Sequence, residues 1–158
     1  MIYLLIGGAQ SVGKSEAIIR TADYLLNNGF SVIAGIYPPT NSNDILIVVE
    51  GLDRAKNKIR ILINSATDTV DIIWGLKKFY DNNLPIDFII SSVRDDGSYP
   101  RTEFFTIMNI QPNVDTIIEI PLAKITRRNV FNTALSWYQT TIDRLIQHTL
   151  SSSPFNVI

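Results

Sequence analysis

The chain has 158 residues, of which 46% are hydrophobic and 18% charged, and its formal net charge is −1. This composition suits one globular domain and excludes a disordered chain. The near-neutral charge gives no electrostatic case for a nucleic-acid or membrane surface, and a sequence without cysteine can form neither disulfides nor thiolate metal sites. No apolar run approaches the roughly 18 residues of a membrane span, so we expect a cytoplasmic protein.

Short apolar runs alternate along the chain with amphipathic stretches of helical length. In chain order we expect strand 2–6, helix 14–28, strand 31–37, strands 44–50 and 58–64, helix 68–82, strand 87–92, helix 100–109, strand 115–121 and helix 129–150. The two strands around the polar turn at 53–57 predict a β-hairpin at one edge of the sheet. We expect residues 1–150 to form a single domain and residues 151–158 to form a C-terminal tail that is loose at 151–154.

Strands that alternate with helices are typical of an α/β fold, with a mostly parallel sheet covered by helices on both faces. Ligands of such sheets bind beyond the carboxyl ends of the strands. Candidate functional residues are therefore sought where strands end.

One motif stands at such a place. The segment Gly8-Ala9-Gln10-Ser11-Val12-Gly13-Lys14-Ser15 follows the first strand and matches G-x-x-x-x-G-K-[ST] at every fixed position. The two glycines allow backbone conformations and a close approach that a side chain would forbid. Backbone N–H groups of such a loop converge on phosphate oxygens, and the N-terminus of the following helix adds unpaired donors and a positive dipole. Lys14 is placed to reach the β- and γ-phosphates, and the Ser15 hydroxyl to coordinate Mg²⁺.

On these residues the chain resembles the P-loop NTPase superfamily. The resemblance implies a three-layer fold and a nucleotide site made of Gly8, Ala9, Gln10, Ser11, Val12, Gly13, Lys14, Ser15 and Glu16. A weaker likeness runs from residue 28 to residue 37 and through the hairpin. There the chain is similar to small kinase-like NTPases of the THEP1 type, with a strand that ends in an aromatic residue before a β-hairpin.

P-loop sites usually hold the metal with an acidic residue at the end of a second strand, and two segments compete for that role. Asp68 follows the strand that runs into Asn64, which we expect to lie beside the P-loop strand, and we predict Ser15 and Asp68 as the magnesium ligands. Asp68 also sits with Thr67 where a helix N-cap belongs. The alternative acids, Asp95 and Asp96, follow the next strand and are also placed to be turn residues before a glycine.

Two groups of cations follow strand ends and are candidates to offset charge on a transferred phosphoryl group. Arg94 and Arg101 flank the loop after residues 87–92, whereas Lys124, Arg127 and Arg128 follow the last strand. We take Lys14, Asp68 and Arg94 as the catalytic candidates.

These features favour binding of ATP with Mg²⁺ by a small kinase or NTPase that would act on a small-molecule phosphoryl acceptor. The sequence has no [NT]-K-x-D guanine-reading motif, since its nearest match, residues 57–60, lacks the aspartate. Two alternatives stay open: a nucleotide-dependent switch that binds a partner, and a P-loop protein without efficient turnover.

Overall fold

A six-stranded sheet organises the chain in the computed structural model, which describes residues 1–40, 44–125 and 131–157. The strand order is β2-β3-β4-β5-β1-β6. The strands are β1 (Ile2–Gly7), β2 (Ser31–Gly35), β3 (Leu46–Leu52), β4 (Lys58–Asn64), β5 (Phe88–Val93) and β6 (Thr116–Pro121). The helices are α1 (Lys14–Asn27), α2 (Val70–Asn82), α3 (Tyr99–Ile107) and α4 (Phe131–Ser151).

The sheet is mostly parallel, which confirms the expected α/β class. Strand β1 lies between β5 and β6 and is parallel to both, and β4 is parallel to β5. Only β3 runs the other way, because it pairs antiparallel with β2 and with β4.

The predicted β3–β4 hairpin is present, but its expected position at the edge of the sheet is wrong. Strand β2 forms that edge and places β3 one strand inside it. The burial of the two strands gives the reason: Ile47, Val48 and Val49 of β3 are fully buried, as in an inner strand, whereas residues of β2 alternate between exposed and half-buried.

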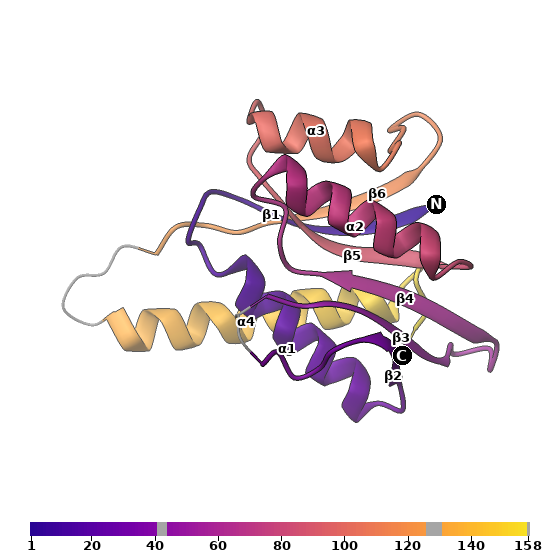
Figure 1. The fold of residues 1–158 in the computed structure, drawn as a ribbon. Coiled ribbons are helices and arrows are strands. Elements are labelled where there is room, and N and C mark those ends of the chain that lie inside the picture. Colours follow the sequence, from indigo (N-terminus) through magenta and orange to yellow (C-terminus); the bar gives the residue numbers. More distant parts are fainter. Residues whose placement is uncertain (41–43, 126–130, 158) are drawn as a thin grey trace.

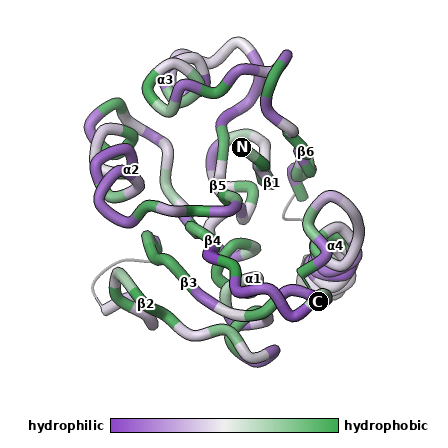
Figure 2. Tube along the Cα trace, turned by 90° about the vertical axis from the view of Figure 1, so that its right-hand side faces the viewer, coloured by the Kyte–Doolittle hydropathy of each residue, from purple (hydrophilic) through white to green (hydrophobic). Residues whose placement is uncertain are grey.

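Helices cover both faces of the sheet, as the sequence predicts (Figures 1 and 2). Leu4 and Ile6 of β1 point to the face covered by α1 and α4, whereas Tyr3 and Leu5 point to the face covered by α2 and α3. Each face thus has its own apolar cluster. Among the described residues, no helix combines the length and the apolar character that crossing a membrane requires.

The C-terminal segment is part of the core, so the expectation of a tail outside the domain is wrong. Phe155 and Val157 are buried in the cluster beneath α1 and α4. The Phe155 ring packs edge-on against Phe88 at a centroid distance of 5.3 Å. The backbone N–H of Arg54, in the hairpin turn, donates to the Asn156 carbonyl at 3.0 Å. This segment therefore packs against the amino ends of β4 and β5.

Candidate functional site

A polar cavity of about 390 Å³ opens at the carboxyl edge of the parallel strands. It lies within the size range of small-molecule sites, roughly 300–1,000 Å³. Its walls come from the glycine-rich loop Gly8–Ser15, the start of α1, the segments that follow β2 and β4, and the end of β5. The lining residues are Gln10, Ser11, Gly13, Lys14, Ser15, Glu16, Asp44, Ser65, Asp68 and Ser92.

The backbone of the glycine-rich loop requires its two motif glycines. Gly8 has φ 141° and Gly13 has φ 94°, conformations that side chains rarely adopt. A Cβ on Gly8 would also lie 3.0 Å from the Leu122 carbonyl oxygen. Gly13 is the N-cap of α1 and makes no side-chain capping bond, so the helix begins with its N-terminal end at the cavity.

Lys14 is the buried cation of the cavity, with only 9% of the residue exposed. Its Nζ donates to the carbonyl oxygens of Gly8 at 2.7 Å and Ala9 at 2.6 Å. Burial, followed by the nearby Arg94 cation, lowers the pKa of the Lys14 ammonium, against the opposing effect of Asp68 and Asp95. An anionic ligand in the cavity would favour the charged form of this lysine.

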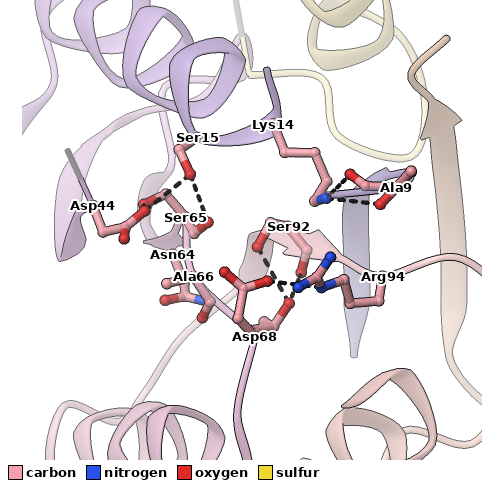
Figure 3. Close-up of polar contacts among 12 residues, drawn as sticks. Ala9, Lys14, Ser15, Asp44, Asn64, Ser65, Ala66, Asp68, Ser92 and Arg94 are labelled. Carbon is pink, nitrogen blue, oxygen red and sulfur yellow. Dashed lines mark hydrogen bonds and ion pairs between the residues drawn. The ribbon is translucent and has the colours of Figure 1, made fainter. Parts of the chain in front are cut away.

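Ser15 meets an acidic residue that the sequence did not single out (Figure 3). Its Oγ lies 2.9 Å from Asp44 Oδ1 and 3.2 Å from the Ser65 carbonyl oxygen. The Ser65 hydroxyl also donates to Asp44 Oδ1, at 2.9 Å, and accepts from the Ile45 N–H.

The direction of β3 explains why Asp44 was not among the predicted site residues. We expected acids only where strands end, but β3 is antiparallel to its neighbours, so its beginning lies at the carboxyl edge. Asp44 comes just before this strand. An acidic residue preceding the apolar run 45–49 in a predicted hairpin is the signal that could have identified it.

Asp68 lies in the same cavity but pairs with Arg94 (Figure 3). The Arg94 Nε is 2.7 Å from Asp68 Oδ1, an ion pair without the alignment of a hydrogen bond. The Asp68 side chain is 53% exposed. The structure thus brings together the catalytic candidates Asp68 and Arg94, and Arg94 is close enough to Lys14 to influence its pKa.

Two expectations about Asp68 are wrong. The N-cap of α2 is Thr69, whose side chain accepts from the Ile72 N–H. Strand β4, which leads to Asp68, is separated from β1 by β5. The short segment between β4 and α2 is long enough to bring Asp68 to the cavity despite that intervening strand.

A hydrogen-bonded polar layer lies beside the cavity at the ends of β4 and β5, and its member Ser92 lines the cavity. The Asn64 amide donates to the Ala66 carbonyl at 2.9 Å and to Ser91 Oγ at 3.0 Å. The Ser91 hydroxyl donates to the Ser92 carbonyl, which lies 3.3 Å from Thr67 Oγ1. These buried contacts fix the ends of β4 and β5 relative to each other.

The remaining predicted residues either do not line the cavity or lie outside the described part of the chain. Arg101 makes a two-point contact with Glu119, at 3.0 and 2.7 Å, and a further ion pair with Asp96. Asp95, Asp96 and Lys124 are exposed and do not line the cavity. Arg127 and Arg128 fall outside the described residues.

A second, smaller slot of about 120 Å³ adjoins the glycine-rich loop on its other side. The two cavities share Ser11, Gly13 and Glu16 as walls. The slot has an apolar side made of Val12, Ala17, Leu122, Ile125, Leu135, Tyr138 and Ile142. Glu16 accepts a hydrogen bond from Gln139 of α4 at 3.1 Å, which joins the slot's helical walls.

The oxygen groups around Ser15 fit Mg²⁺. A hydroxyl, a carboxylate and a backbone carbonyl meet there, and Mg²⁺ prefers oxygen ligands and keeps several waters or phosphate oxygens. The described residues contain no group of three or more His, Cys, Asp or Glu side chains able to hold a metal ion. Waters or phosphate oxygens of a ligand would therefore complete the coordination.

Comparisons with known proteins add no relative: no family model, no curated protein and no solved structure matches this chain.

Proposed function

We propose that this protein binds a nucleoside triphosphate with Mg²⁺ at the Gly8–Ser15 loop and that it acts on the γ-phosphate as a small phosphotransferase or NTPase. The observation that supports it most is the complete G-x-x-x-x-G-K-S loop, which joins a buried strand to a helix and opens onto a polar cavity. A buried lysine kept beside two left-handed glycines is costly to stability, and anion binding supplies a reason for it.

Each residue of the site then has a role. The N–H groups of the loop and the start of α1 would hold the phosphates, and Lys14 would leave the Gly8 and Ala9 carbonyls to contact them. Ser15 and Asp44 would hold Mg²⁺, which supplies charge neutralisation for the phosphates. Arg94, held by Asp68, would offset negative charge on the γ-phosphoryl group.

The slot beside the loop supports a nucleoside as the rest of the ligand. It shares walls with the phosphate cavity and adds an apolar side that suits a base. ATP is the triphosphate we favour, because the chain lacks a guanine-reading motif.

The test is the thermal stabilisation of the full chain by ATP and GTP, with and without Mg²⁺. A ligand present at a hundred times its dissociation constant stabilises the folded state by about 2.7 kcal/mol. We expect Mg-ATP to stabilise the parent and to lose most of that effect in Lys14→Ala. Lys56→Asn serves as a control, because Lys56 is exposed on the hairpin turn and has φ 66°, which asparagine tolerates. Equal stabilisation of Lys14→Ala and the parent would contradict the proposal.

A nucleotide-dependent switch is the second candidate, favoured by the contacts of the loop. Ser15 bonds to Asp44, which precedes β3, and to Ser65, which follows β4. A ligand that draws Ser15 toward Mg²⁺ would disturb both segments. Labelled ATP separates the candidates: transfer to an acceptor well above phosphate release supports the phosphotransferase. Slow release with different hydrogen exchange at residues 44–46 in ATP and ADP states supports the switch.

A further inference from the structure

A third cavity, of about 420 Å³, lies between α2 and the strands β3 and β4. Its lining is mainly apolar, from Ile45, Leu46, Ile72, Leu76 and Phe79. No residue of the glycine-rich loop lines it, and its only links with the phosphate cavity and the polar layer beside that cavity are Asp44, Asn64 and Ala66. The proposed nucleotide site therefore leaves this cavity without a role.

Gly75 is an exposed residue on the helix side of the cavity. It lies in the interior of α2 and lines the cavity, and a Cβ built on it would meet no atom within 4 Å. A glycine inside a helix costs about 1 kcal/mol relative to alanine, and close packing does not require it here. The space that it leaves is available to a ligand.

Polar groups stand at the two ends of the cavity. Helix α2 starts at the carboxyl edge of the sheet and runs back along β4 toward the amino edge (Figure 1). Asp44 and Asn64 therefore lie at one end, and Lys78 and Asn82 toward the other. A carboxylate accepts hydrogen bonds from a hydroxyl or amine, and a lysine attracts an anion.

From this arrangement we propose that the cavity binds a small elongated molecule with an apolar body, a hydroxyl or amino group at the Asp44 end and a carboxylate at the Lys78 end. Asp44 also lines the phosphate cavity and bonds to Ser15, so the two ligands share one carboxylate. Binding in the cavity stands independently of the nucleotide, whereas its coupling to Mg-ATP rests on the proposed function.

Three probes test the ligand chemistry on the full chain: para-hydroxyphenylpropanoate, phenylpropanoate without the hydroxyl, and para-ethylphenol without the carboxylate. Titration is followed by the backbone amide NMR shifts of Leu46, Ala66 and Gly75. We expect the first probe to bind most tightly and the loss of either end to weaken binding about fivefold, the value of one ordinary hydrogen bond.

Gly75→Leu should fill the cavity and weaken the first probe at least about tenfold, while leucine's better helix propensity favours folding. Trp74→Leu is the matched control on the same helix, because Trp74 is exposed and does not line the cavity. The control should bind within about twofold of the parent, and circular dichroism verifies that both variants are folded.

Several outcomes would overturn the proposal: no saturable binding of any probe, equal binding to Gly75→Leu and the parent, or probe shifts confined to other elements. Shifts of the same amides that depend on protein concentration without probe would assign the cavity to a second copy of the chain and also overturn it. Addition of Mg-ATP separates the two hypotheses. Probe binding by a protein that does not bind Mg-ATP contradicts only the proposed function, and nucleotide binding without probe binding contradicts only this inference.

Discussion

The two ends of the parallel strands differ in what they bury. At the amino end, Phe88, Phe155 and Val157 pack together with apolar contacts. At the carboxyl end lie all the buried polar residues of the described chain except Thr21, namely Lys14, Asn64, Ser65, Thr67, Ser91 and Ser92.

This difference separates stability from binding. Burial of apolar surface favours folding, whereas buried polar groups must be paired to avoid a cost. The carboxyl end contains such pairs, a buried lysine and two left-handed glycines. Because burial of polar groups at the carboxyl edge lowers stability and that edge contains a cavity, we expect ligands to bind there. The apolar contacts at the opposite edge compensate by stabilising the fold.

The strongest test of this separation is Phe155→Ala. We expect the free energy of unfolding to fall by about 3–5 kcal/mol, as for other buried phenylalanines, with Mg-ATP affinity unchanged. Urea denaturation measures the loss, and Tyr99→Ala, at an exposed aromatic residue, is the control with little effect. A loss below about 1 kcal/mol would show that the amino end does not carry this stability.

The two arginines that flank the loop after β5, Arg94 and Arg101 of α3, sharpen the comparison within the carboxyl end. Arg101 holds Glu119 and donates to the Arg94 carbonyl at 3.0 Å, so Arg101→Gln should cost about 2 kcal/mol of unfolding free energy. Arg94→Gln should cost less stability and instead reduce turnover of the γ-phosphate. If Arg94→Gln proves the more destabilising variant, Arg94 has a structural role and the assignment of the two arginines is reversed.

Much of the architecture could be predicted from the sequence because it depends on local patterns. Buried strands are continuous apolar runs, and α1 and α2 carry apolar stripes that the structure buries. The position of the glycine-rich loop follows from the same pattern. The edge strand was misplaced because strand order is a long-range property, which the alternation of strands and helices leaves undetermined.

The candidate site was less predictable for the same reason. Arg94 and Arg101 both follow β5 in the sequence, and their long-range partners, Asp68 for Arg94 and Glu119 for Arg101, distinguish them. Asp44 reaches Ser15 because β3 is antiparallel and begins at the carboxyl edge, whereas we expected acids only where strands end. The burial of Phe155 depends on Phe88, which is far away in the sequence.

The two acids of the cavity give a smaller and more specific prediction. Asp44→Asn should weaken the Mg²⁺ dependence of ATP binding about tenfold, because Asp44 contacts Ser15 and loss of a supporting carboxylate typically costs 10–100-fold in metal affinity. Asp68→Asn should have the lesser effect on Mg²⁺, since Asp68 pairs with Arg94. Calorimetric titration of ATP at several Mg²⁺ concentrations measures both variants. A larger loss in Asp68→Asn would restore Asp68 as the metal's acid.

The smallest expected effect concerns the cost of Lys14 to the protein without a ligand. Because folding lowers the pKa of Lys14, the unfolded chain binds more protons between the folded pKa and the ordinary value near 10.4. The stability contribution of Lys14 therefore rises with pH across that window, and its penalty is fully present at lower pH.

Lys14→Met should be as stable as the parent or more stable at neutral pH, by less than about 1 kcal/mol, and this advantage should shrink as the pH rises into the window. Urea denaturation from neutral pH to pH 10 measures the difference, with Lys56→Asn as the control for removing a positive charge. A Lys14→Met variant that is clearly destabilised at neutral pH would mean that the bonds to Gly8 and Ala9 outweigh the cost of burial, so that Lys14 contributes to the fold itself. The carboxyl end would then contribute stability as well as binding, and the separation of the two ends would not hold.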